Sequence, residues 1–183
     1  MAESEASPDS MAAAGMHSPG ISSPEKEAQL HQAALEGDLS LVKALVEEGT
    51  AVNAMDADGR TALMYAAFNG HSQVVLYLLD QDAVPDRRDL LGRTALFFAS
   101  TGPFPETVSI LIDRGSEVNV VDSNEHFSPL MHAAAEGNLD VVKLLVTAGA
   151  DTRLKDIDGD DAASFARQAG HAAVVQYLEA LPR

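Results

Sequence analysis

Apolar residues recur along the chain at a spacing that predicts pairs of short helices. In segments 74–79 and 141–146, Val or Leu stands at positions i, i+1, i+4 and i+5, which places the apolar side chains on one face of a helix. A shorter segment rich in alanine precedes each of these, for example "TALMYAAFNG" at 61–70, and it ends near a glycine that suits a helix C-terminus. Because one such pair cannot bury its apolar face alone, each pair needs neighbours.

The paired block recurs at a nearly constant period. Copies start at Asp56, Asp89, Asp122 and Asp156, so they are 33, 33 and 34 residues apart, and a first copy lacks the opening turn. One apolar position keeps the phase: Leu30, Leu63, Leu96, Leu130 and Ala163. The pattern predicts five copies at about 25–55, 56–88, 89–121, 122–155 and 156–183.

Residues 1–24 form a tail of different composition. They are rich in Ala, Ser, Pro and Gly, contain no Lys or Arg, and are predicted to be disordered. Ser-Pro pairs at Ser7, Ser18 and Ser23 could serve a proline-directed kinase, although such tails contain these residues in any case. At the end of the tail, Ser23, Pro24 and Glu25 have the order of an N-cap, a first-position proline and a first-turn acid.

The segment "DIDGDD" at 156–161 has the alternating aspartates of a calcium loop, but the rest of that motif is missing. An EF-hand loop needs Gly at its sixth position and Glu at its twelfth, where this chain has Asp161 and Arg167. The segment is the fifth copy of the turn that reads "DADGRT" at 56–61. We therefore interpret it as a structural turn and predict no metal site.

The repeated block resembles the ankyrin repeat. The resemblance rests on the 33-residue period, on "GRTAL" at 59–63, on "SPLMHAA" at 128–134, on the Gly-His pairs at 70–71 and 170–171, and on "GAD" at 149–151, and it covers residues 25–183. It implies an all-α solenoid of helix-turn-helix pairs with projecting β-hairpin fingers, and a protein that binds other proteins. Ankyrin repeats often have His where Met64, Phe97 and Met131 stand, and that His ties each finger to its neighbour.

Composition narrows the possible functions. The chain has no cysteine, which excludes disulfides and thiol catalysis, and its net charge of −16 disfavours nucleic acid. No apolar run could span a bilayer, and no two His have the helical spacing of a metal site. We expect no catalytic residues, no cofactor, no membrane contact and a monomeric free state. We expect a cytoplasmic location, with a removed leader sequence left open, and an acidic surface that favours a basic partner.

The resemblance implies that partner contacts come from the fingers and from the exposed side of each first helix. Copies two and three gather apolar residues at these positions, and we expect Tyr65, Phe68, Leu90, Leu91, Phe97 and Phe98 to lie side by side. Phe97 and Met64 could instead fill the space of the missing His. The full set of predicted partner-binding residues is Arg60, Tyr65, Phe68, Asn69, Leu90, Leu91, Arg93, Phe98, Phe104, His126, Phe127, His132 and Glu136.

Two irregularities add to this set. Pro103 replaces a glycine, and we expect it to stiffen a loop that exposes Phe104, while one extra residue lengthens the fourth finger, "DSNEHF". The predicted function is a non-catalytic adaptor. An inhibitor or immunity-type protein that blocks an enzyme is the alternative, and a subunit of a hetero-oligomeric enzyme is a third hypothesis.

Overall fold

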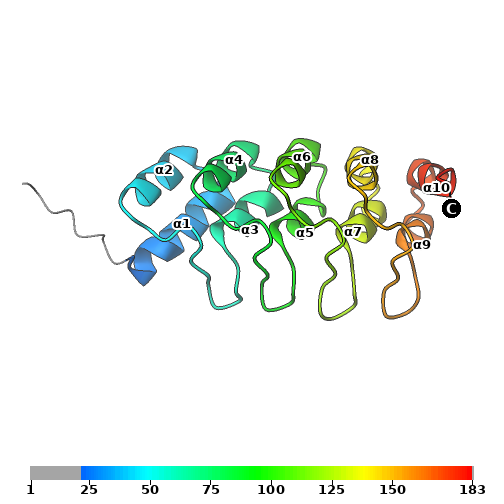
Figure 1. The fold of residues 1–183 in the computed structure, drawn as a ribbon, viewed down its shortest axis with the longest axis horizontal. Coiled ribbons are helices and arrows are strands. Elements are labelled where there is room, and N and C mark those ends of the chain that lie inside the picture. The colour runs from blue at the N-terminus through cyan, green and yellow to red at the C-terminus, as the bar shows by residue number, and fades with distance from the viewer. Residues whose placement is uncertain (1–21, 183) are drawn as a thin grey trace, which may run out of the picture.

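Five pairs of antiparallel helices form a single elongated stack in the computed structural model, which describes residues 22–182. The first helices of the pairs lie in one row and the second helices in another, with the loops between pairs projecting to one side (Figure 1). The pairs are α1 (Pro24–Glu36) with α2 (Leu39–Glu47), α3 (Ala62–Phe68) with α4 (Ser72–Asp80), α5 (Ala95–Ala99) with α6 (Pro105–Asp113), α7 (Pro129–Ala135) with α8 (Leu139–Thr147), and α9 (Ala162–Gln168) with α10 (Ala172–Glu179). The predicted all-α solenoid is confirmed.

Each first helix begins at a polar cap that the repeat supplies. The side chains of Thr61, Thr94, Ser128 and Asp161 accept a hydrogen bond from the backbone amide three residues later, which satisfies a free donor of the helix N-terminus. Ser23 caps α1 in the same way, with Pro24 following, as the sequence predicts. The cap therefore fixes where every first helix starts.

The core runs through the whole stack along the first helices. Leu30, Leu63, Leu96 and Leu130 are at most 1% exposed, and each first helix packs against the next. The apolar faces of the second helices close the core from the other side, with Val75 and Val142 fully buried. The copies thus bury each other's apolar surface, which no single pair could do.

The loops between pairs are held by aspartates and by one another. Asp156 shows the pattern: its Oδ1 accepts from the amides of Asp158 and Asp160, so this carboxylate shapes the turn in "DIDGDD" while Asp161 caps α9. The predicted β-hairpin character is not seen, because residues 22–182 contain turns and no strand. Consecutive loops are instead joined tip to tip by single backbone hydrogen bonds: Leu90 N to Asp58 O (2.9 Å), Ser123 N to Leu91 O (2.8 Å) and Ile157 N to Glu125 O (3.0 Å).

The hydrogen bonds between loop tips matter where Met64, Phe97 and Met131 replace the family's histidine. His31 keeps the position of the family's His in the first copy, and its Nε2 lies 3.0 Å from the carbonyl oxygen of Ala54 in the following loop. At the matching positions, Met64 and Met131 are buried in the core and make no such link. The backbone bonds between loops therefore link the fingers without the missing histidines.

The predicted disordered tail, with Ser7 and Ser18, lies outside the described residues, except for its last three positions. None of the helices within 22–182 is both long enough and apolar enough to cross a membrane.

Candidate functional site

A pocket opens between the first helices of copies two and three. It has a volume of about 250 Å³, and we call it the α3–α5 pocket. Its lining consists of residues from α1, α3, α5 and the two loops that precede α3 and α5: Leu35, Arg60, Met64, Tyr65, Phe68, Arg93 and Phe98. Five of these are predicted partner-binding residues, namely Arg60, Tyr65, Phe68, Arg93 and Phe98.

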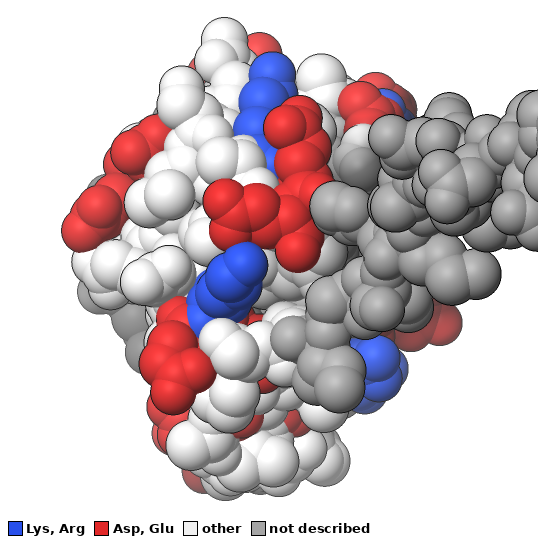
Figure 2. All heavy atoms as spheres, turned by 90° about the vertical axis from the view of Figure 1, so that its left-hand side faces the viewer, with Lys and Arg blue, Asp and Glu red and all other residues white. Residues whose placement is uncertain are grey.

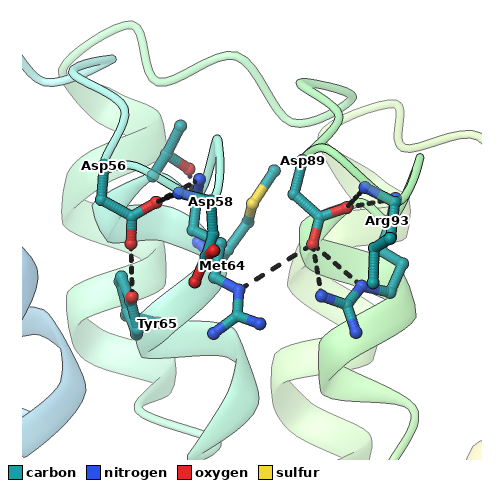
Figure 3. Close-up of polar contacts among 9 residues, drawn as sticks. Asp56, Asp58, Met64, Tyr65, Asp89 and Arg93 are labelled. Atoms are coloured by element: carbon teal, nitrogen blue, oxygen red, sulfur yellow. Dashed lines mark hydrogen bonds and ion pairs between the residues drawn. The ribbon is translucent and has the colours of Figure 1, made fainter.

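A buried carboxylate organises the two arginines of the pocket (Figure 3). Asp89 is 6% exposed; its Oδ1 accepts from the amides of Leu91 and Arg93, and its Oδ2 accepts from Nε (2.8 Å) and Nη2 (2.7 Å) of Arg93. Arg60 also points toward this oxygen, but its Nε stays 3.9 Å away. Arg93 is therefore held by two short hydrogen bonds to Asp89, whereas the ion pair of Arg60 with Asp89 is long.

Tyr65 closes one side of the pocket through a second carboxylate. Its hydroxyl donates to Oδ2 of Asp56 (2.5 Å), and Oδ1 of Asp56 accepts from the amides of Asp58 and Arg60. Burial acts to raise the pKa of Asp56, but the hydrogen bonds from Tyr65 and from the two amides outweigh it, so this pKa lies below its usual range. Burial and the bond to Asp56 raise the pKa of the Tyr65 hydroxyl, so it stays a donor at neutral pH.

Two phenylalanines give the pocket its apolar wall. Phe68 is 47% exposed, and its ring meets that of Phe98 edge to face with centroids 6.2 Å apart. The guanidinium carbons of Arg93 and Arg60 lie 4.9 and 5.7 Å from the centroid of the Phe98 ring, within the range of cation–π attraction. The pocket thus combines an exposed ring, a buried ring and two cations.

Some residues that were expected to be exposed are not. Phe98 is 8% exposed and Phe97 is 3% exposed, because short α5 lies between α3 and α7 and turns both rings into the stack. Met64 is also buried, in line with the alternative that Phe97 and Met64 fill space left by the missing His. The expectation of an exposed ring is therefore wrong for Phe98, although Phe98 is part of the pocket lining, while Phe97 follows the packing alternative.

The two leucines of the loop before α5, Leu90 and Leu91, lie outside the pocket. Leu90 is 72% exposed and is the most exposed large apolar residue of segment 22–182. Leu91 is half-buried, and its backbone carbonyl accepts a hydrogen bond from the amide of Ser123 in the neighbouring loop. Neither residue is part of the pocket lining.

Phe104 also differs from its expected placement. It is half-buried, because its ring packs against the backbone of Gly70 and Gly102, where an added Cβ would lie 2.2 Å from ring carbons. The imidazoles of His71 and His171 pack in the same manner against Gly37 and Gly137. Phe104 therefore joins copies two and three, just as His71 joins copies one and two and His171 joins copies four and five.

A row of rings fills the matching space farther along the stack, and we call it the closed aromatic row. His132 lies between Phe97 and Phe127, with centroids 4.7 and 4.6 Å away, and Phe127 lies 4.6 Å from Phe165. Burial lowers the pKa of His132 to about 4; the charge of Asp122 opposes this shift and that of Arg93 adds to it. His132 is thus a neutral packing residue at physiological pH.

The remaining predicted site residues lie on the rim or farther away. Asn69 is exposed and donates through Nδ2 to the carbonyl of Leu35 (2.7 Å), which also accepts from Nε2 of His71 (3.0 Å). Glu136 is exposed at the end of α7, and His126 is exposed in the fourth loop. The structure does not bring these last two to the α3–α5 pocket.

Sequence reasoning missed Leu35 of the lining and the carboxylate of Asp89 that organises the arginines, while Met64, the other lining residue outside the predicted set, was considered as packing. Asp89 served only to mark the start of a copy, yet Arg93 four residues later carried the signal for an ion pair within the turn. Leu35, at the end of α1, had no signal, because its contribution depends on α1 packing beside α3.

Comparison with known proteins gives a family and short local relatives. A family model described as ankyrin repeats (3 copies) matches residues 30–122 and 103–180. Notch-regulated ankyrin repeat-containing protein B of Danio rerio is 49% identical over 49 residues, which are 27% of this chain and 44% of that protein, and its counterpart from Homo sapiens is 47% identical over 49 residues (27% and 43%). A probable E3 ubiquitin-protein ligase of Oryza sativa subsp. japonica, XBOS33, is 47% identical over 51 residues (28% and 10%). The chain spans less than half the length of these curated relatives.

Proposed function

Because the chain belongs to the ankyrin-repeat family, we propose that it is a non-catalytic adaptor that binds a partner protein through the loops and first helices of copies two and three. Ankyrin repeats are generally protein–protein interaction modules and are generally non-catalytic. The observation that carries the proposal is the α3–α5 pocket, with half-exposed Phe68 beside it and exposed Leu90 on the adjoining loop. An exposed ring next to partly buried arginines has the composition of an interface hot spot.

The charge of the surface favours a partner with basic groups around this anchor. The chain has 28 acidic and 12 basic residues, and acidic side chains outnumber basic ones on the N-terminal end of the stack (Figure 2). Such a field accelerates the association of a basic partner and weakens with salt. The basic partner surface, the monomeric free state and the cytoplasmic location stay predictions.

The test is affinity capture from the native cell extract with three forms of the full chain. These are the wild type, a Phe68→Ala/Leu90→Ala variant and a control Leu41→Ala/Leu76→Ala variant, whose leucines are 42% and 40% exposed on the second helices α2 and α4. We expect mass spectrometry to find a protein retained by wild type and control but lost by the first variant. With the purified partner, the dissociation constant should then rise at least about 10-fold, the loss expected of a hot spot.

Two other results would change the proposal. Equal capture by all three forms would exclude copies two and three as the binding surface. Capture of an enzyme whose activity falls when this chain binds would favour the inhibitor hypothesis over the adaptor. Melting curves of all three forms show whether each variant is folded.

A further inference from the structure

We infer that the α3–α5 pocket receives one carboxylate side chain, an Asp or Glu flanked by an apolar residue, from a linear segment of the partner. This inference deepens the proposed function and rests on it. It differs from the basic partner surface suggested by overall charge, because it concerns a single anchor residue within a contact of otherwise opposite charge.

The first argument is the hydrogen-bonding balance of the pocket. The acceptors around it are occupied: Asp56 by Tyr65 and two amides, and Asp89 by Arg93 and two amides. The carbonyl of Leu35 is occupied as well, by Asn69 and by a ring nitrogen of His71. These groups therefore offer a ligand donor few free acceptor sites, because Asp89 accepts four hydrogen bonds and Asp56 accepts three, whereas a ligand acceptor meets two guanidinium groups.

The second argument is the unused donor. Nε of Arg60 is buried and has no hydrogen-bond partner among residues 22–182, and the only ion pair of this guanidinium there is the 3.9 Å contact with Asp89. A buried unpaired donor costs free energy, and the cost is larger for a charged group. A ligand does not reach the buried Nε, but the Arg60 side chain is 31% exposed, so the rest of its guanidinium can meet a ligand in the pocket.

The third argument is the sign of the charge. Among the seven lining residues, Arg60 and Arg93 are charged and both are cationic. The carboxylates of Asp89 and Asp56 lie close by without being part of the lining, so these four groups are neutral in sum while the lining itself presents cations. One carboxylate therefore leaves a single negative charge at the site, while a dianionic phosphate would leave two in a chain whose net charge is −16.

The fourth argument is shape and surroundings. A pocket of about 250 Å³ accommodates the methylene groups of a Glu together with part of an apolar neighbour, and Phe68 and Phe98 supply the apolar wall. The side chains of Arg60 and Arg93 are 31% and 18% exposed, and partial burial strengthens an Arg–carboxylate hydrogen bond relative to one on an open surface. The pocket therefore selects an acidic residue next to an apolar one rather than acidity in general.

The neighbouring copies show that this site is local. Phe127 stands in copy four at the position that Arg60 and Arg93 hold in copies two and three, and its ring fills the space between His132 and Phe165. The fifth copy has Asp160 at this position. A carboxylate ligand thus has its place between copies two and three and none farther along the stack.

The test uses a phage-displayed library of random dodecapeptides, selected on the full chain and counter-selected on its Arg60→Met variant. We expect the enriched peptides to share an Asp or Glu beside Leu, Phe or Met. The best peptide is then synthesised with its acidic residue as Glu, as Gln and as phosphoserine, and dissociation constants are measured by calorimetry. Replacing Glu by Gln should weaken binding to the wild type at least about 10-fold, which is about 1.4 kcal/mol.

The protein-side control is Arg88→Met, because Arg88 lies in the loop that also carries Arg93 but forms its ion pair with Glu117, and it is not part of the pocket lining. We expect Arg60→Met to weaken binding of the Glu peptide by the same factor as the Glu-to-Gln change does on the wild type. The Arg60→Met variant should bind the Glu and Gln peptides with equal affinity. The Arg88→Met variant should bind both peptides as the wild type does. The Glu-to-Gln comparison on the wild type tests the inference even if Arg60→Met does not fold.

Several results would overturn the inference. These are a library that enriches no peptide, enriched peptides without a shared acidic residue, a Gln peptide that binds as well as the Glu peptide, and a phosphoserine peptide that binds about 10-fold tighter than Glu. If Phe68→Ala/Leu90→Ala loses the captured partner while Arg60→Met keeps it, the proposed function stands and the carboxylate inference fails.

Discussion

The α3–α5 pocket and the closed aromatic row occupy matching places in neighbouring copies, yet one is open and the other is filled. The helical frame is similar in both, since the phase leucines stay buried, although the loop before α7 is one residue longer and α5 has 5 residues where α3 and α7 have 7. One difference lies at the last loop position before the helix cap, where Arg60 and Arg93 line the pocket and the ring of Phe127 fills the space against His132 and Phe165. Another lies on the first helices, where Ala135 corresponds to Phe68 of the pocket. These positions together account for one junction being open and the other filled.

The same comparison shows two ways of holding a loop residue in place. Arg93 is fixed by hydrogen bonds to a buried carboxylate, while Phe127 is fixed by contact with His132 and Phe165. The first way leaves polar groups near the surface for recognition, and the second converts the same area into core. The following predictions test this contrast.

The largest contrast is expected between the aspartates that organise the two loops. Asp89→Ala should lower the free energy of unfolding by about 3–5 kcal/mol, because it leaves the guanidinium of Arg93 without its buried partner. Asp122→Ala should cost roughly 1.5–3 kcal/mol, because Asp122 accepts only the amides of Glu125 and Phe127. Urea titration of both variants measures the difference, and equal losses would show that the Asp89 ion pair adds no stability.

The core beneath the two junctions should respond equally. Leu63 belongs to α3 at the α3–α5 pocket, and Leu130 belongs to α7 at the closed aromatic row. Both leucines are 1% exposed, so Leu63→Ala and Leu130→Ala should each lower the free energy of unfolding by ~2–5 kcal/mol. Thermal and urea unfolding test this. A variant that unfolds like wild type would place its leucine outside the core and contradict the repeat frame.

The closed aromatic row should make the free energy of unfolding depend on pH through His132. Its pKa is about 4 in the folded chain and 6.5 in the unfolded chain, so only the unfolded state binds this proton between those values. Stability should therefore be complete above about pH 6.5 and fall by about 1–3 kcal/mol on going down to about pH 4. Unfolding in urea at several pH values measures this fall.

Two variants isolate the contribution of His132 from those of the carboxylates. His132→Phe removes the titrating group and should flatten this part of the profile, and Phe127→Ala should flatten it partly, because water that reaches the imidazole raises its pKa. A wild-type profile that matches that of His132→Phe would assign the pH dependence to other groups.

The smallest effect is expected at His126 in the lengthened loop before α7. The backbone of His126 has φ of 57°, in the left-handed region. In the other loops a glycine has this conformation, namely Gly59, Gly92 and Gly159. His126→Gly should relieve this strain and change the free energy of unfolding by less than about 1 kcal/mol in the stabilising direction. A clear loss of stability would mean that the His126 side chain supports the loop.

The repeat frame and its caps follow from sequence because they depend on local pattern. The phase leucines and the Ser23 cap are where the sequence predicts them. The partner-binding prediction was less complete, since the exposure of Phe98 and Phe104 depends on how neighbouring copies pack. Likewise, Leu35 joins the pocket only because α1 lies beside α3. Periodicity describes one copy, whereas the pocket belongs to the contact between copies.

The hydrogen bonds between loop tips have a consequence for how such a surface diversifies. They join an amide of one loop to a carbonyl of the loop before it, so no side chain takes part, and almost any residue except proline can stand at the donor position. In the fourth loop the acceptor moves from the second to the third residue after the aspartate, from Asp58 and Leu91 to Glu125, so an insertion is absorbed without breaking the link. Mutation can therefore rewrite the residues that a partner meets while the spacing between loops is inherited unchanged.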